Sequence, residues 1–173
     1  MDFLNVNEAL GYLDLKESYS AAEFGCGTAD FSLALAKALD KGRVYALDIQ
    51  QDKLSVLKNK MALQKIYNIS TIICDLEAPN GSTLKSNFLD IVLIPNVLFQ
   101  SENRHAIMEE AKRILKPRGQ LLVIDWLKPV AFGPKENLID PKEVKELANI
   151  LEISLKKEFA LGDYHYGLIF IKG

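Results

Sequence analysis

Two glycines and a nearby acid form the segment of this chain that is best suited to bind a ligand. Gly25 and Gly27 follow a short apolar run, Ser20–Phe24, and an apolar helix is expected directly behind them, while Glu23 stands just before the first glycine. Backbone without side chains at the mouth of a helix lets a ligand lie against the main chain and the helix N-terminus. A carboxylate at Glu23 would repel a phosphate. The segment therefore predicts a ligand that is cationic at this point, such as a sulfonium amino acid cofactor; the alternative is that Glu23 is an ordinary exposed acid.

Two further acids stand at the ends of expected strands. Asp48 closes the strand expected over residues 44–47, and Asp75 follows the strand expected over residues 70–74. An acid at the carboxyl end of the second strand can accept hydrogen bonds from both hydroxyls of a ribose. The alternatives are that Asp48 caps the helix expected over residues 51–63, and that Asp75 is a loop acid bonded to nearby backbone amides.

The main competing interpretation of the glycines is a nicotinamide or flavin site. That fingerprint needs a third glycine at the position that Asp30 occupies in this chain. An acid at the helix mouth would repel a pyrophosphate, so a dinucleotide is disfavoured.

Short apolar runs alternate with amphipathic segments along most of the chain, which predicts a doubly wound, Rossmann-like α/β fold with a mostly parallel sheet in a single domain. The expected strands cover residues 20–24, 44–47, 70–74, 88–94, 120–126, 153–159 and 164–171. The expected helices cover residues 31–39, 51–63, 102–115 and 143–150, the third ended by Pro117 and Gly119. Only a short turn, Gly162-Asp163, joins the last two strands, so these must be antiparallel. We therefore expect a seven-stranded sheet whose last strand is reversed.

Composition narrows the classes of protein. The 173 residues are 49% hydrophobic and 25% charged, with a net charge of −2, which is typical of a globular protein and makes nucleic acid an unexpected partner. The start of the chain has no signal-peptide pattern and the longest apolar run is too short to span a bilayer, so a cytoplasmic location is expected. Cys26 and Cys74 give neither a disulfide framework nor a zinc site, and no metal is expected.

Residues 23–29, Glu-Phe-Gly-Cys-Gly-Thr-Ala, resemble the first motif of class I S-adenosylmethionine-dependent methyltransferases. Residues 111–120 resemble the helix-to-strand junction of the branch that methylates ubiquinone and menaquinone precursors. The resemblance covers residues 20–127 well and implies S-adenosylmethionine as cofactor, with Asp48 at its ribose and Asp75 near its adenine. Ala29 replaces the usual third glycine, and its methyl group could tighten the cofactor pocket. The cofactor-binding residues so implied are Glu23, Phe24, Gly25, Cys26, Gly27, Asp48, Ile49, Asp75, Leu76 and Asn96.

The methyl acceptor is expected beyond the carboxyl ends of the fourth and fifth strands. In the implied fold the reversed strand lies beside the fifth, which predicts Asp125, His165 and Tyr164 as polar, catalytic groups facing the acceptor, with Trp126 as an apolar wall. His165 or Asp125 would act as a base if the acceptor must lose a proton. The alternative is that the aromatic residues belong to the core and that His165 is a satisfied surface histidine.

Several functions remain open at this point. The first is methyl transfer to a small, partly apolar molecule; the others are a non-catalytic cofactor-binding module that acts with a partner chain, and a methyltransferase on RNA or protein. Residues 127–140 could form a lid over the site or a plain crossover. The basic cluster Lys112, Arg113, Lys116 and Arg118 is expected to be a solvated helix end. The oligomeric state is left open.

Overall fold

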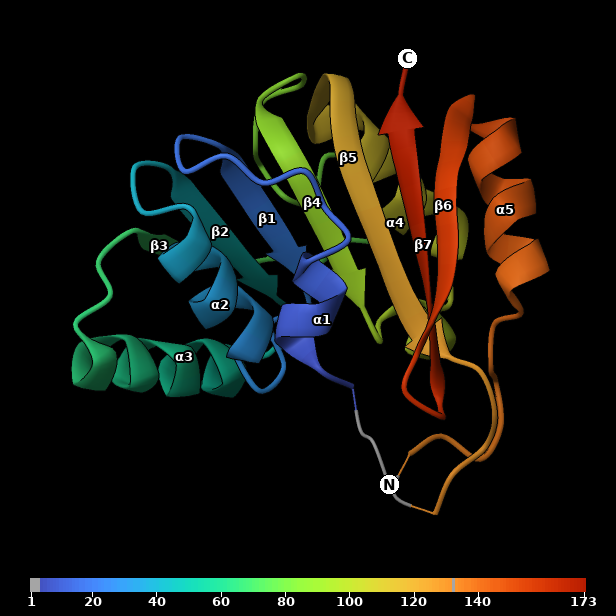
Figure 1. The fold of residues 1–173 in the computed structure, drawn as a ribbon, viewed down its shortest axis with the longest axis horizontal. Coiled ribbons are helices and arrows are strands. Elements are labelled where there is room, and N and C mark those ends of the chain that lie inside the picture. The colour runs from blue at the N-terminus through green and yellow to red at the C-terminus, as the bar shows by residue number, and fades with distance from the viewer. Residues whose placement is uncertain (1–3, 132) are drawn as a thin grey trace.

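A single twisted sheet organises the chain (Figure 1). The computed structural model describes residues 4–131 and 133–173; residues 1–3, part of the N-terminal pattern considered above, and Phe132, within the possible lid, lie outside the described residues. The strands run in the order β3-β2-β1-β4-β5-β7-β6. Their bounds are β1 Ser20–Phe24, β2 Arg43–Asp48, β3 Ile69–Ile73, β4 Leu89–Pro95, β5 Leu115–Trp126, β6 Ile153–Leu161 and β7 His165–Lys172.

The strand directions confirm the expected topology. β1 pairs in parallel with β2 and β4, and the pairs β2–β3 and β4–β5 are parallel as well. β7 is antiparallel to both of its neighbours, β5 and β6. The carboxyl ends of β1 to β5 therefore meet at one edge of the sheet, and the start of β7 lies at that same edge.

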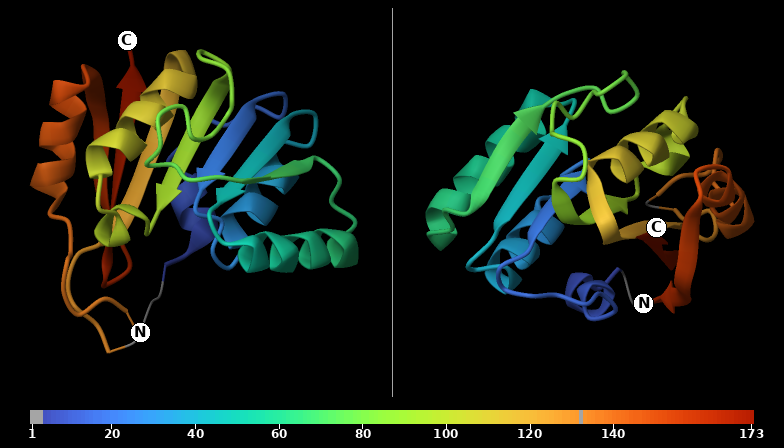
Figure 2. Two further views of the ribbon diagram at one scale, coloured as in Figure 1. Left: turned by 180° about the vertical axis from the view of Figure 1, so that it is seen from behind. Right: turned by 90° about the horizontal axis from the view of Figure 1, so that it is seen from above.

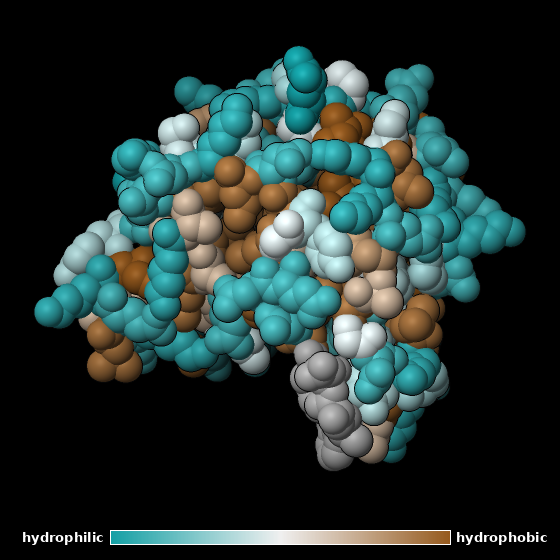
Figure 3. Space-filling model, in the orientation of Figure 1, coloured by the Kyte–Doolittle hydropathy of each residue, from teal (hydrophilic) through white to brown (hydrophobic). Residues whose placement is uncertain are grey.

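Helices cover both faces of the sheet (Figures 1 and 2). Their bounds are α1 Val6–Leu10, α2 Asp30–Ala38, α3 Gln51–Gln64, α4 Arg104–Ile114 and α5 Pro141–Ile150, with a 3-10 turn at Leu98–Gln100. The helices α1, α2 and α3 pack with one apolar cluster, and α4 and α5 pack with the other. Figure 3 shows the face of α1–α3, where hydrophilic side chains dominate and hydrophobic ones gather between the helices.

The side chains of the central strands alternate between the two clusters. In β5, Leu121 and Val123 belong to the cluster beneath α4 and α5, whereas Leu122 and Ile124 belong to the cluster beneath α1–α3. This alternation is the period-two geometry of a strand. By the same alternation, Asp125 and Trp126 at the end of β5 face opposite sides of the sheet.

Two local expectations need correction. Pro117 and Gly119 lie within β5 and do not end α4, because the helix already ends at Ile114 and β5 follows at once. Arg113 is no solvated helix end: its guanidinium donates to the buried carboxylate of Glu110 at 2.7 Å and to the Leu84 carbonyl at 2.8 Å. Neither α1 nor the 3-10 turn was expected.

Among the described residues, no helix combines the length and the apolar character that a membrane crossing requires.

Candidate active site

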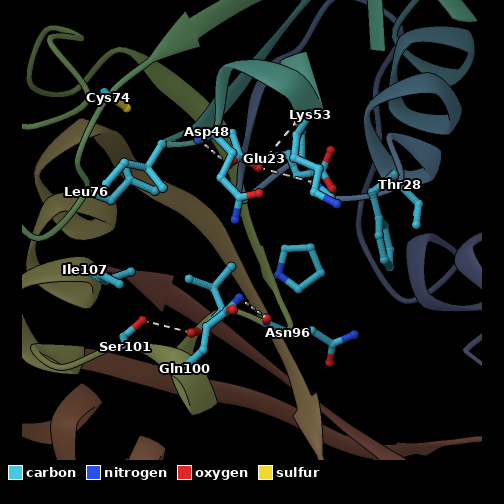
Figure 4. A pocket seen from close by; sticks show the side chains of 18 of the residues that line it. Glu23, Thr28, Asp48, Lys53, Cys74, Leu76, Asn96, Gln100, Ser101 and Ile107 are labelled. Atoms are coloured by element: carbon cyan, nitrogen blue, oxygen red, sulfur yellow. Dashed lines mark hydrogen bonds between the residues drawn. The ribbon is translucent and has the colours of Figure 1, made fainter. Parts of the chain in front are cut away.

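A cavity of about 600 Å³ opens at the carboxyl edge of β1, β2 and β4 (Figure 4). Nine of the ten expected cofactor residues line it: Glu23, Gly25, Cys26, Gly27, Asp48, Ile49, Asp75, Leu76 and Asn96. Phe24 does not line it, because its side chain is fully buried in the cluster beneath α4 and α5. The elements that converge here are far apart in sequence, so the sheet is what assembles the site.

The glycine turn forms one wall of the cavity. Gly25 has φ +74° and Gly27 has φ +43°, values that L side chains rarely adopt. A Cβ atom on Gly25 would stand 2.6 Å from Cγ2 of Val97, another lining residue. Backbone thus approaches the cavity closely at Gly25, as expected from its glycine.

Ala29, the departure from the usual glycine pattern, also lies in the left-handed region, with φ +74°. Its side chain is fully buried in the cluster beneath α1–α3 and does not line the cavity. The extra methyl group therefore packs into the core at the start of α2, away from the cavity, and the expected narrowing of the pocket does not occur there.

Asp48 projects from the end of β2 into the cavity (Figure 4). One carboxylate oxygen accepts a hydrogen bond from the Gln50 backbone N–H at 2.9 Å. The other accepts a longer one, 3.4 Å, from the Gly27 backbone N–H, and the Cys26 thiol lies 3.7 Å away. These contacts hold the carboxylate beside the glycine turn. Asp48 is not the N-cap of α3, because that position belongs to Gln50.

Glu23 is buried, so the alternative of an ordinary exposed acid is wrong. Its carboxylate accepts a hydrogen bond from the Ser32 hydroxyl on α2. Burial raises the pKa of Glu23 to about 8, outweighing the opposite effect of that hydrogen bond. Since Glu23 lines the cavity, a nearby cation would favour its charged form.

Asp75, Leu76 and Ile49 line the side of the cavity nearest to β2 and β3. Asp75 is exposed, and its carboxylate accepts a hydrogen bond from the Glu77 backbone N–H at 2.9 Å. The loop-acid alternative is therefore correct as a description of its contacts, and the same residue also faces the cavity. Leu76 is buried, whereas the side chain of Ile49 is 63% exposed.

Asn96 follows β4 in the left-handed region, with φ +55°. Its backbone N–H donates to the Ile124 carbonyl at 2.8 Å, and its carbonyl accepts from the Gln100 side chain at 3.1 Å. Its side-chain oxygen is buried and has no hydrogen-bond partner among the described residues. Asn96 thus lines the cavity, and its side-chain oxygen is enclosed by protein.

The sequence reasoning missed several lining residues. Leu4 and Val6 come from the N-terminal segment, Lys53 from α3, and Gln100 and Ser101 from the 3-10 turn and the residue behind it. Nothing in the sequence marks Leu4 or Val6, because isolated apolar residues are common everywhere. Gln100 and Ser101 had a signal, since they belong to the segment that leaves β4 at the edge expected to face a ligand.

The expected acceptor-facing residues divide between the two faces of the sheet. In the β5–β7 pairing Trp126 is level with His165, and Asp125 is level with Tyr166. Neighbouring side chains of β5 point to opposite faces, so Asp125 lies on the side of α4 and α5 while Trp126 and His165 lie on the side of α1–α3. Asp125 and His165 therefore do not converge.

Each of these residues has its own surroundings. The Asp125 carboxylate accepts hydrogen bonds from the backbone N–H groups of Trp126 at 2.8 Å and Phe99 at 3.2 Å, and burial raises its pKa to about 6. The His165 side chain is buried, which lowers its pKa to about 4. Tyr164 is half-buried, with the Lys128 ammonium 4.8 Å from its ring centre. None of the three lines the described cavity, so their catalytic role stays a prediction.

Residues 127–140 are tied to the rest of the chain at both ends. The Leu127 backbone N–H donates to the Tyr164 carbonyl at 2.7 Å, and the Tyr166 hydroxyl donates to the Ile139 carbonyl at 3.0 Å. Arg104 of α4 also donates to the Asn137 carbonyl at 3.1 Å. These contacts anchor both ends of the segment, and a role for it as a lid stays a prediction.

Comparison with known proteins finds relatives both in sequence and in fold. A family model described as a methyltransferase domain matches residues 15–158. A demethylmenaquinone methyltransferase of Bacillus mycoides is 28% identical over 134 residues, covering 76% of this chain and 55% of that protein. The chain thus spans about half the length of such curated relatives.

Solved structures share the fold. A structure described as a SAM-dependent methyltransferase from Aquifex aeolicus has a TM-score of 0.88 at 22% identity and covers 98% of this chain and 90% of that one. The [4+2]-cyclase SpnF has a TM-score of 0.84 at 12% identity, with 96% of this chain and 79% of that one covered. The same fold therefore occurs in proteins with different reactions, so the function of this chain has to be inferred from the residues of its site.

Proposed function

This chain belongs to the methyltransferase domain family, and from that premise we propose that it transfers a methyl group from S-adenosylmethionine, bound in the cavity at the carboxyl edge, to a small, partly apolar acceptor. The family match confirms the resemblance to class I S-adenosylmethionine-dependent methyltransferases. The observation that carries the proposal is the placement of the Asp48 carboxylate beside the glycine turn in one cavity.

The residues present fit the cofactor. Asp48 offers carboxylate oxygens to the two hydroxyls of a ribose. Gly25 lets the turn pack tightly against Val97 at the wall of the cavity, where a Cβ atom would collide, and Asn96 lines the same cavity. Leu76 and Ile49 supply apolar surface for a flat base, next to Asp75.

The charge of the site fits as well. The lining residues include Glu23, Asp48 and Asp75 against a single lysine, Lys53. A cofactor that carries a sulfonium and an ammonium group suits such a cavity better than a phosphate does. Because burial raises the pKa of Glu23 to about 8, its carboxyl is largely neutral near pH 7, and a nearby cation would favour its charged form.

The bound cofactor would supply the reactive methyl group itself. What remains for the chain is to hold the acceptor in line with that group and to exclude water. The apolar lining from Leu4, Val6 and Ile107 serves the second purpose. A base is needed only where the acceptor must lose a proton.

A small acceptor is proposed on the strength of relatives named for demethylmenaquinone methylation. Because the chain spans about half of their length, their whole activity does not carry over to it. The alternatives of a non-catalytic module and of a methyltransferase on RNA or protein become outcomes of the tests.

Binding of S-adenosylhomocysteine, measured by calorimetry, tests the cofactor site. Asp48→Asn is expected to weaken binding at least about tenfold, since it removes a charged hydrogen-bond acceptor worth roughly 1.5–3 kcal/mol. Asp52→Asn, which changes an exposed acid in the first turn of α3, is the matched control and should leave the affinity unchanged. No measurable binding by the wild-type chain would refute the proposal.

Transfer is tested with methyl-labelled S-adenosylmethionine and three separate acceptor fractions: small metabolites, RNA and protein. The proposal expects label in the small-metabolite fraction, lost in Asp48→Asn. Label in RNA or protein instead would contradict the small acceptor, and tight cofactor binding without transfer to any fraction would favour the non-catalytic module.

A further inference from the structure

The side chain of Glu77 joins two walls of the cavity that lie far apart in the sequence. Glu77 belongs to the loop that follows β3, and it lines the cavity itself. Its carboxylate accepts hydrogen bonds from the backbone N–H groups of Glu102 at 3.2 Å and Asn103 at 2.9 Å. These two residues lie directly before α4 and directly after Ser101, another lining residue. One carboxylate therefore holds the loop against the segment that leads into α4.

The hydrogen bonds to Glu77 are of a strong kind. A bond to an ionised acceptor is shorter and stronger than one between neutral groups, and two such bonds meet at this side chain. The carboxylate also lies at the N-terminus of α4, where the helix dipole favours a negative charge. Glu77 is half-buried, so the solvent screens the contact only in part. The loop is thus fixed at this point by charge as well as by geometry.

Other contacts hold the same loop without help from Glu77. Leu76 is buried in one apolar cluster with Ile107 of α4, and both side chains line the cavity (Figure 4). Farther along the loop, the Ser82 backbone N–H donates to the buried carboxylate of Glu110 at 3.0 Å. Loss of the Glu77 carboxylate should therefore leave the loop attached to α4 and change only its exact position.

The exact position matters because Glu77 also orients Asp75. The Asp75 carboxylate accepts a hydrogen bond from the Glu77 backbone N–H at 2.9 Å, which leaves its second oxygen to a donor in the cavity. The backbone of Glu77 thus sets the direction of the Asp75 carboxylate, and the side chain of Glu77 fixes that backbone against the start of α4.

We propose that Glu77 is a positioning residue for the nucleobase of the cofactor: it holds Asp75 where the Asp75 carboxylate accepts a hydrogen bond from the exocyclic amino group of adenine. The inference rests on the proposed function, in which Asp75 lies beside the base. A carbonyl group in place of that amino group would bring two acceptors together with no proton between them. The preference for the amino group therefore depends on Glu77, which acts through Asp75.

Two ligands that differ at this group test the proposal. S-inosylhomocysteine carries a carbonyl where S-adenosylhomocysteine carries the amino group, and its affinity is measured by calorimetric displacement. The wild type is expected to bind S-adenosylhomocysteine at least about tenfold more tightly. Glu77→Ala should reduce this ratio at least about threefold, through weaker binding of the adenosyl ligand. Because both ligands carry the same charge, the general effect of removing a carboxylate cancels in the ratio.

Matched variants separate positioning from folding. Glu77→Gln keeps an oxygen acceptor and should retain most of the ratio. Glu102→Ala removes an exposed carboxylate but keeps the backbone N–H that Glu77 binds, so both affinities should stay unchanged. A wild-type ratio near one, or an unchanged ratio in Glu77→Ala, overturns the proposal. Equal losses for both ligands in Glu77→Ala, together with a lower thermal midpoint, would show a structural role instead.

The same measurements keep the two proposals apart. A wild-type chain that does not bind S-adenosylhomocysteine refutes the proposed function. A wild-type chain that binds it, with a ratio that Glu77→Ala does not change, refutes only the role of Glu77.

Discussion

The buried carboxyl of Glu23 is expected to make the stability of this chain depend on pH in the range where most proteins are insensitive. Its pKa is about 8 in the folded chain against an ordinary 4.5, so the folded state holds the proton more tightly than the unfolded state does. Stability is then lost as pH rises from 4.5 through 8. The full loss is about 5 kcal/mol, at 1.36 kcal/mol for each unit of pKa difference, and about 2 kcal/mol of it falls between pH 6 and pH 8.

Glu23→Gln removes the titrating proton and keeps an acceptor for the Ser32 hydroxyl. The free energy of unfolding, measured in urea at constant ionic strength, is expected to exceed that of the wild type by a margin that grows by about 2 kcal/mol from pH 6 to pH 8. Taking the difference between the two proteins cancels the contributions of Asp125 and His165. Glu109→Gln, at an exposed glutamate on α4, is the control and should run parallel to the wild type.

The same experiment links stability to the cofactor. Saturating S-adenosylmethionine should flatten the pH dependence of the wild type, because a bound cation lowers the pKa of a neighbouring carboxyl. Equal pH dependence in the wild type and Glu23→Gln, without ligand, would refute the reasoning about burial. If saturating S-adenosylmethionine leaves the difference in unfolding free energy between Glu23→Gln and the wild type unchanged, the cationic end of the cofactor does not lie beside Glu23.

Three further predictions concern backbone positions. Gly25→Ala should lower stability by roughly 1–2 kcal/mol and weaken the binding of S-adenosylhomocysteine, because the alanine would have to adopt φ +74° and its Cβ atom would meet Val97. An affinity equal to that of the wild type, measured by calorimetry, would contradict this. Gly167→Ala should lose about 1–3 kcal/mol in urea unfolding, since its Cβ atom would lie 2.3 Å from the Phe159 ring, and Phe159→Leu in the same chain should recover part of the loss. Ala29→Gly should change stability by less than about 1 kcal/mol, because it relieves the backbone strain at φ +74° but loses a buried methyl group and makes the unfolded chain more flexible. The affinity of this variant for S-adenosylhomocysteine, measured by calorimetry, should equal that of the wild type.

The fold and most of the cofactor site follow from local patterns. Apolar runs of four to seven residues separated by amphipathic segments determine a parallel sheet, and an acid or glycine that ends such a run must lie at its carboxyl edge. The places of Asp48 and Asp75 in the lining of the cavity were therefore predictable to the residue. The helix α1 was not, because five residues give too short a periodic signal, and its contact with the cavity depends on long-range packing.

Phe24 shows the limit of a motif. The resemblance assigns a whole run of residues to the cofactor, but alternate residues of a strand point to opposite faces. Glu23 and Gly25 reach the cavity, and Phe24 between them packs beneath α4 and α5. Membership of a motif therefore predicts the position of the backbone better than the direction of each side chain.

The acceptor end of the site depends on a register that the sequence pattern left open. The short turn predicted that the last two strands are antiparallel, and the fold placed the reversed strand beside β5. The level of His165 with Trp126 belongs to the β5–β7 pairing, whereas the turn at residues 162–164, in which Gly162 has φ +57°, sets β7 against β6. A shift of one residue would move every side chain of β7 to the other face. It would bring His165 to the side of Asp125, where an acid and an imidazole could act together as a base. The observed β5–β7 register separates them and leaves a neutral histidine beside Trp126, so Asp125 and His165 do not form a base together.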